Sequence, residues 1–262
     1  MKQRIIVGLI ALPLVLLPIW LGGIWAVLFF VAVAVGASRE FYHMVRQGGY
    51  HPSTLLGILW TVALVLAYVY PNILRLSTVL MAGLTITLVE VMHEKREPMH
   101  TWMATGMGAI YLGILLGQIA ALRLLPDGLW WVFFGLAVTW INDSAAYFTG
   151  VTVGRHKLWP RLSPKKTWEG TVAGWLAAAL AGTAMILLTP LQATHSPLFG
   201  LVVGFGGGLL ALLGDLAVST LKRQVGVKDS GHFLPGHGGI LDRLDSLLFV
   251  LPYVYQVVTL WG

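Results

Sequence analysis

Long runs of apolar residues, separated by short polar segments, make up most of this 262-residue chain. A helix needs about 20 apolar residues, at 1.5 Å each, to cross the hydrocarbon core of a bilayer. The run over residues 5–38 has no charged side chain and is too long for one crossing, and Leu21-Gly22-Gly23 supplies a break. The pattern therefore predicts nine membrane spans, near residues 5–20, 24–42, 53–70, 73–92, 100–122, 128–150, 169–190, 197–222 and 240–260.

The composition supports an all-α polytopic membrane protein. Hydrophobic residues make up 57% of the chain and charged residues 11%, whereas soluble domains have about 45–50% and about 25%. The connecting segments are short, and we find no internal repeat or soluble domain. We therefore expect one membrane domain over residues 1–262, with N-terminal helices in residues 1–130 and a catalytic half in residues 131–262 that carries the polar motifs.

Basic residues gather on one side of the predicted spans. If the N-terminus is cytoplasmic, 15 of the 17 Lys and Arg residues face the cytoplasm, and only Arg75 and Arg123 face the opposite side. This asymmetry is typical of membrane proteins. It explains the net charge of +6 without nucleic acid as a partner. The predicted orientation is N-in and C-out, with the late polar loops in the cytoplasm.

Several classes of site are excluded by what the sequence lacks. There is no cysteine, so disulfides, thiolate nucleophiles and cysteine-based zinc sites are ruled out. Neither a P-loop nor a G-x-S-x-G motif occurs. The glycine-rich run Gly204–Gly208 lies inside an apolar segment, which favours a close helix–helix contact over a nucleotide-binding loop.

Two polar clusters lie in the middle of the chain. Asn142 and Asp143 end an apolar run, where a carboxylate costs a few kcal/mol and marks either a functional site or an ion pair between helices. Lys165, Lys166 and Thr167 precede an apolar segment, and cationic and hydroxyl groups beside a helix N-terminus suit phosphate binding. The lysines alone would be read as positive flanks of a span, and Glu169 suits the first turn of a helix for electrostatic reasons.

The third cluster occupies the last polar segment and the apolar run before it. Asp215 lies on that run, and Asp242 and Asp245 are spaced to share one face of a helix at the start of the last span. Carboxylates near lysines and glycines suggest a hard cation such as Mg²⁺ that holds phosphates. His232 and His237 lack the spacing of zinc ligands, so hydrogen bonding is the expected role of both.

In this order the three clusters resemble the phosphatidate cytidylyltransferases, or CDP-diacylglycerol synthases. That family's signature reads S-x-hydrophobic-K-R, four residues, K-D, and then, after a short loop, H-G-G-hydrophobic-x-D-R-hydrophobic-D. It is matched by Ser219, Lys222, Arg223, Lys228, Asp229, His237, Gly238, Gly239, Asp242, Arg243 and Asp245. The family's upstream N-D-x-x-A-Y and S-P-K-K-T-x-E-G elements are matched at residues 142–147 and 163–170.

The resemblance implies transfer of CMP from CTP to phosphatidic acid, which gives CDP-diacylglycerol and pyrophosphate and uses Mg²⁺. It implies Asp215 and Asp242 as metal ligands, possible use of a monovalent cation such as K⁺, a homodimer, and a site on the cytoplasmic side of a bacterial inner membrane. The catalytic residues are expected to be Asp215, Asp242, Lys222, Arg223 and Asp245. The substrate-binding residues are expected to be Asn142, Asp143, Lys165, Lys166, Thr167, Glu169, Lys228, Asp229, His237 and Arg243.

Two other functions stay open at this point. An ion-coupled transporter also carries intramembrane carboxylates, although the acids here gather at one face with lysines and glycines. A related CTP-dependent enzyme with another lipid acceptor is the second alternative, because the apolar half has no readable code for the lipid. A CDP-alcohol phosphotransferase is disfavoured, since its D-x-x-D-G-x-x-A-R motif does not occur.

Overall fold

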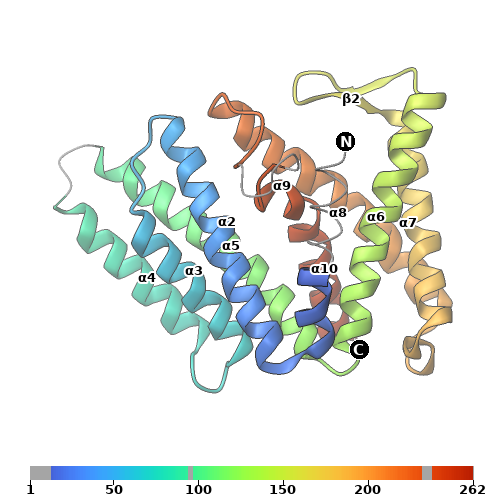
Figure 1. The fold of residues 1–262 in the computed structure, drawn as a ribbon, viewed down its shortest axis with the longest axis horizontal. Coiled ribbons are helices and arrows are strands. Elements are labelled where there is room, and N and C mark those ends of the chain that lie inside the picture. The colour runs from blue at the N-terminus through green and yellow to red at the C-terminus, as the bar shows by residue number, and fades with distance from the viewer. Residues whose placement is uncertain (1–12, 94–96, 232–237, 262) are drawn as a thin grey trace. The chain divides into compact units, whose positions relative to one another are not determined.

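The structure, a computed structural model, describes residues 13–93, 97–231 and 238–261 (Figure 1). It is 79% helical, which confirms the predicted all-α class. The chain groups into two compact units. The first unit consists of Met1–Leu124 and Lys222–Arg243, and the second of Leu125–Leu221 and Leu244–Gly262.

The first unit is a group of long helices joined by short loops (Figure 1). Residues 13–21 are helical, and the last residues of α8 (Pro197–Gln224), from Lys222 onwards, also belong to this unit. Its remaining helices are α2 (Gly23–Gln47), α3 (Thr54–Val69), α4 (Leu76–Val91), α5 (Pro98–Leu124) and, up to Arg243, the single turn α9 (Leu241–Leu244).

The predicted break after the first apolar run is confirmed. Gly22 and Gly23 have φ angles of 69° and 48°, a backbone conformation that glycine adopts without the steric penalty of a side chain. The guanidinium group of Arg123 donates hydrogen bonds to the backbone carbonyls of Ile19 and Trp20. Because the last carbonyls of a helix have no partner within it, Arg123 stabilises the end of the first helix.

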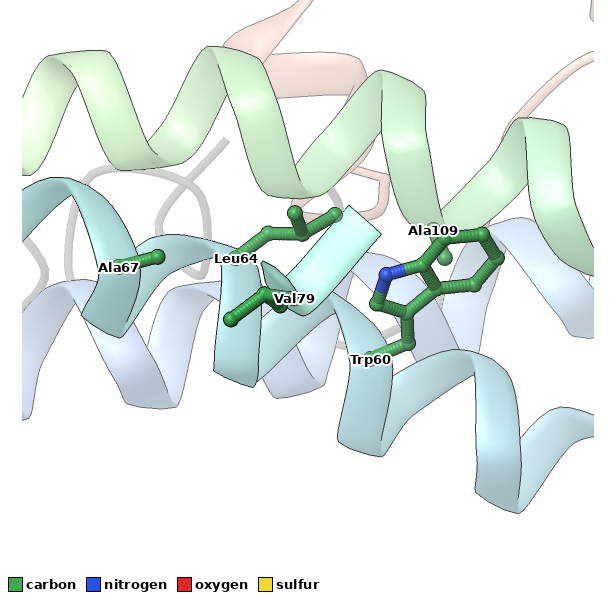
Figure 2. Packing of buried hydrophobic residues seen from close by; sticks show 5 residues of the cluster. All are labelled: Trp60, Leu64, Ala67, Val79 and Ala109. Atoms are coloured by element: carbon green, nitrogen blue, oxygen red, sulfur yellow. The ribbon is translucent and has the colours of Figure 1, made fainter. Parts of the chain in front are cut away.

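The core of this unit forms where α3 meets α4 and α5. Figure 2 shows Trp60, Leu64 and Ala67 of α3 beside Val79 of α4 and Ala109 of α5. Helices gain no hydrophobic free energy by leaving lipid for one another, so their association depends on close van der Waals packing. A large indole beside small residues is one way to achieve that fit.

The second unit combines helices with one small sheet. In α8, Gly204 packs so closely against Ala178 and Gly182 of α7 (Trp168–Leu188) that a side chain at Gly204 would meet the α7 backbone. This confirms the predicted role of the glycine-rich run as a helix contact. The elements are α6 (Gly128–Thr152), β1 (Lys157–Trp159), β2 (Ser163–Thr167), α7 (Trp168–Leu188), the 3₁₀ turn η1 (Pro190–Ala193), α8 (Pro197–Gln224) and α10 (Leu247–Trp261).

Two details differ from the sequence expectation. Strands β1 and β2 form an antiparallel hairpin that pairs Lys157 with Thr167, in a segment expected to be a loop. The segment expected as one span over residues 240–260 consists of two helices, because α9 ends at Leu244 and α10 begins at Leu247. The helical spacing that would place Asp242 and Asp245 on one face is therefore interrupted, and that expectation was wrong.

The helices have the character of membrane spans. Over the described residues, α2, α5, α7 and α8 are long and apolar enough to cross a bilayer, while α3, α4 and α10 are apolar but shorter. Together with the composition, this indicates an integral membrane protein. The number of crossings and the N-in orientation stay predictions.

Gly83 on α4 and Gly106 on α5 both face Trp60, but a methyl group would overlap the indole at Gly83 and would only touch it, at 3.7 Å, at Gly106. We expect Gly83→Ala to destabilise the protein by about 1–3 kcal/mol through overpacking. Gly106→Ala should be neutral or stabilising by up to about 1 kcal/mol, because alanine favours helix. Thermal unfolding in detergent micelles measures both, and equal effects at the two positions would contradict the packing argument.

Candidate active site

A cavity of about 710 Å³ lies within the second unit, between α6, the hairpin, α7 and α8. It gathers residues from all three polar clusters of the sequence, which lie up to 73 positions apart. The expected site residues that line it are Asn142, Asp143, Lys165, Lys166, Thr167 and Asp215.

An ion pair joins the hairpin to α8 at this cavity. The ammonium group of Lys166 lies 2.6 Å from Oδ2 of Asp215, and both side chains are largely shielded, with 25% and 33% of their surfaces exposed. The hydroxyl of Ser219, one turn later on α8, donates to Oδ1 of Asp215 at 3.2 Å. A charge pair in this partly buried setting is screened less than one at the surface, so it fixes Lys166 beside the carboxylate.

Asn142 and Asp143 supply the wall formed by α6. The amide of Asn142 donates to Oδ1 of Asp143 at 3.1 Å, and Asn142 itself is buried. Asp143 interacts electrostatically with Lys166 and with Asp215. The cavity thus holds two carboxylates that repel each other electrostatically, and the ammonium group of Lys166 attracts both.

Thr167 and Glu169 build the junction between the hairpin and α7. The Thr167 hydroxyl caps the helix by accepting from the backbone N–H of Gly170, which satisfies one of the free donors at a helix start. Glu169 accepts from the backbone N–H groups of Arg155 and His156, and its carboxylate lies 2.6 Å from Nδ1 of His156. Glu169 is not among the residues that line the cavity. Its contacts stabilise the base of the hairpin. Its expected role in substrate binding stays a prediction.

A second charged centre lies in the first unit, around Asp242. Oδ1 of Asp242 lies 2.6 Å from the ammonium group of Lys222, and the two side chains are 7% and 12% exposed. Oδ2 accepts from the backbone N–H and the hydroxyl of Ser230, at 2.8 and 3.0 Å, and from the N–H of Gly239 at 3.0 Å. Four donors therefore surround this carboxylate.

These donors determine the acidity of Asp242. Burial alone would raise the pKa of the Asp242 carboxyl, but the hydrogen bonds from Lys222, Gly239 and Ser230 favour its charged form and hold the pKa below its ordinary value. Asp242 is therefore ionised at neutral pH, and it connects the end of α8 to the segment that precedes α9.

The remaining expected residues lie around these centres. Arg223 donates to the backbone carbonyl of Val227 at 3.2 Å and so stabilises the turn after α8. Lys228, Asp229 and Arg243 are exposed. Asp245 accepts a hydrogen bond from the N–H of Ser246 at the start of α10. The two histidines of the third cluster, His232 and His237, lie outside the described residues.

Comparison with known proteins places this arrangement in a family. The sequence pattern of the cytidylyltransferase family matches residues 2–261. The phosphatidate cytidylyltransferase of Bacillus subtilis (strain 168) is 33% identical over 268 residues, which cover 100% of this chain and 99% of the relative. That of Brucella melitensis biotype 1 is 35% identical over 266 residues, which cover 97% of this chain and 92% of the relative. The chain belongs to the cytidylyltransferase family.

The cavity of this cytidylyltransferase also contains residues that the motifs did not point to. Lys157 adds a third lysine, and Thr171 and Trp175 extend the wall formed by α7. The spacing of Thr167, Thr171 and Trp175 at intervals of four is a helical pattern that could have identified them as one face. Lys157 had no comparable signal, because a three-residue strand is too short to show periodicity.

The cavity has the donor chemistry of a magnesium site. Mg²⁺ binds through one or two carboxylates and completes its shell with water and phosphate oxygens. Asp143 and Asp215 supply hard carboxylate oxygens there, although the described residues include no group of three His, Asp or Glu side chains placed to hold a metal ion. Asp215 lies in the second unit and Asp242 in the first, so joint binding of a metal ion by these two stays a prediction.

The contacts of Asp242 also predict how stability depends on pH. Because the pKa of Asp242 is lower in the folded protein than its unfolded value near 3.9, its charge stabilises the fold above about pH 4 and stops doing so as pH falls through the folded pKa. Asp242→Asn leaves Lys222 without its partner, so we expect a loss of up to about 3 kcal/mol at pH 7.

Thermal unfolding of the wild type and of Asp242→Asn between pH 3 and pH 7 tests this expectation. The difference in unfolding temperature between the wild type and Asp242→Asn should be largest at pH 6–7 and should shrink below about pH 4. Asp229→Asn, at an exposed aspartate in the same segment, is the matched control and should change stability by no more than about 0.5 kcal/mol. A difference that is the same at every pH would contradict the ionic role of Asp242.

Proposed function

We propose that this protein transfers CMP from CTP to phosphatidate and releases CDP-diacylglycerol and pyrophosphate. The relatives that match it over nearly their full length are phosphatidate cytidylyltransferases, and the sequence carries the three motifs of that family. The reaction takes place where the bilayer meets the cytoplasm. There, CTP enters from water while the acyl chains of the lipid stay in the membrane.

The observation that carries this proposal is the charge arrangement of the cavity in the second unit. Lys157, Lys165 and Lys166 line the same space as the carboxylates of Asp143 and Asp215. Lysines bind phosphates as point charges, and carboxylates bind the cations that accompany nucleotides. A cavity that offers both suits a triphosphate with its counterion better than it suits a transported inorganic ion.

The transfer needs little acid–base help from the protein. The second pKa of a phosphate monoester is near 6, so the phosphate of phosphatidate is largely dianionic at pH 7. One of its oxygens attacks the α-phosphorus of CTP, and a new P–O bond forms as the bond to the β-phosphate oxygen breaks. Pyrophosphate leaves with the electrons of that bond, and no proton has to be moved.

The protein therefore acts by positioning its substrates and by stabilising charge. Lys165 and Lys166 lie on β2 beside the start of α7, where an ammonium group can stabilise the negative charge that builds up on the departing pyrophosphate. Glu169 maintains this arrangement because it bonds the backbone at Arg155 and His156, at the base of the hairpin. Trp175 and Leu212 line the cavity as well, and their apolar surfaces would exclude water from that side.

Mg²⁺ is the metal ion that this donor set fits, and Asp215 and Asp143 would hold it. When bound, it would neutralise charge on the triphosphate and polarise the α-phosphate. Participation of Asp242 in the same metal site, a second monovalent cation such as K⁺, and a homodimer are implied by the resemblance and belong to this proposal. Membership of the cytidylyltransferase family disfavours an ion-coupled transporter, and the names of the relatives favour phosphatidate over another lipid acceptor.

The proposal is tested with purified protein in detergent micelles that contain phosphatidate, CTP and Mg²⁺. We expect stoichiometric formation of pyrophosphate and a CDP-lipid. Lys165→Ala and Lys166→Ala should each lower kcat/KM for CTP at least tenfold, since a lost charge-assisted contact to phosphate costs about 1.5–3 kcal/mol.

Arg161→Ala is the matched control. Arg161 carries the same charge and is exposed in the same hairpin, but it does not line the cavity, so activity should stay within about twofold of the wild type. An equal loss in all three variants would indicate a general effect of positive charge and would contradict the assigned site. Absence of any CDP-lipid with the wild type would contradict the proposed reaction.

A further inference from the structure

Glu40 on α2 lies in the N-terminal half of the chain, where the sequence showed no site motif. It contacts the signature segment, residues 219–245, which carries the matched family signature. Its Oε2 accepts a hydrogen bond from the backbone N–H of Leu241 at 3.0 Å. The hydroxyl of Ser230 lies 3.2 Å from the same oxygen. All three residues belong to the first unit, so the contact links parts of the chain that are about 200 residues apart.

Ser230 connects Glu40 to Asp242. The Ser230 hydroxyl is 3.0 Å from Oδ2 of Asp242, and its backbone N–H donates to that same oxygen at 2.8 Å. A hydroxyl has one hydrogen, so it serves one carboxylate at a time. The steady donors are backbone N–H groups: Leu241 donates to Glu40, and Ser230 and Gly239 donate to Asp242. All three lie within the signature segment.

Two glycines fit closely around the Glu40 carboxylate. A methyl group on Gly231 would lie 2.7 Å from Cδ of Glu40, and one on Gly239 would overlap both Oε2 of Glu40 and the hydroxyl of Ser230. Any side chain at Gly239 would therefore displace the carboxylate or the serine. Gly239 is the second glycine of the H-G-G motif, and its close packing against Glu40 of α2 explains why a glycine is needed there.

Stability alone does not account for a carboxylate in this position. Oε1 of Glu40 is buried and receives no hydrogen bond from any of the residues that the structure describes, and a buried acceptor without a donor costs about 1–3 kcal/mol. The hydrogen bonds that described residues donate to Glu40 all go to Oε2, and they come from the segment that also carries Asp242. The geometry therefore favours a role in placing that segment over a role in holding the fold together.

We propose that Glu40 is a positioning residue for nucleotidyl transfer, a role that rests on the proposed function. It holds Ser230 and Leu241 so that Asp242 receives its backbone donors and keeps Lys222 paired at 2.6 Å. What this role requires is an acceptor oxygen at a fixed place. A negative charge on residue 40 is not required.

Three variants separate this role from its alternatives. Glu40→Ala removes the acceptor, and we expect kcat/KM to fall at least tenfold. Glu40→Gln retains an amide oxygen that can accept from Leu241, so its activity should stay within about threefold of the wild type. Glu90→Ala is the matched control, because Glu90 lies on α4 in the same unit and also has one buried oxygen to which no described residue donates. It should stay within about twofold.

Hydrogen exchange, followed by mass spectrometry on the same purified proteins, measures the anchoring without any substrate. Exchange at the amides of residues 239–241 should be at least tenfold faster in Glu40→Ala than in the wild type, and unchanged in Glu40→Gln and Glu90→Ala. Activity lost equally in Glu40→Gln and Glu40→Ala would overturn the proposal, since charge would then be the requirement. Unchanged exchange in Glu40→Ala would overturn it as well. A wild-type protein that forms no CDP-lipid would contradict the proposed function, while the exchange rates still decide the anchoring.

Discussion

Charge in this protein has to be neutralised locally, and the polar architecture follows from that constraint. An ionised side chain is costly in an apolar chain unless a partner of opposite charge or several hydrogen-bond donors accompany it. The pairs Lys166–Asp215 and Lys222–Asp242 meet this requirement, one in each unit and each at 2.6 Å. Each pair also joins segments that are distant in sequence, so neutralising charge and positioning functional groups are achieved by the same contacts.

The packing of the apolar helices depends on a different constraint, the close approach of one helix backbone to its neighbour. Trp60 packs against Gly83 in the first unit, and Gly204 packs against Gly182 in the second. Since lipid competes with any apolar helix face, small residues that let backbones approach provide the specificity of association. The rigid helices that result provide fixed supports for short polar segments such as the β1–β2 hairpin.

The sequence predicted those features that depend on local pattern. Apolar run lengths located the helices, and the Leu21-Gly22-Gly23 break was placed correctly because glycine adopts positive φ angles that other residues avoid. Six of the expected site residues, from Asn142 to Asp215, line one cavity, and they could be identified because charged and amide groups stand out in an apolar chain. What failed was the continuity of the last span, because no apolar count reveals that the helix stops at Leu244.

Features that depend on contacts across long stretches of chain left no trace in the sequence pattern. Glu40 meets the signature segment about 200 residues later, and nothing in the residues around it distinguishes it from a charge at the end of a span. Lys157 enters the cavity only through a strand of three residues. Periodicity reports which face of an element is apolar, but it cannot report which other element that face will meet.

The bond from Arg123 to the first helix has a consequence for biosynthesis. The carbonyl of Ile19 is made 104 residues before its guanidinium partner, so the growing chain carries an unsatisfied helix end until α5 has been synthesised. Until then, water or lipid headgroups must solvate that end, which favours keeping it near the membrane surface. The arrival of α5 then closes a loop that extends from Ile19 to Arg123.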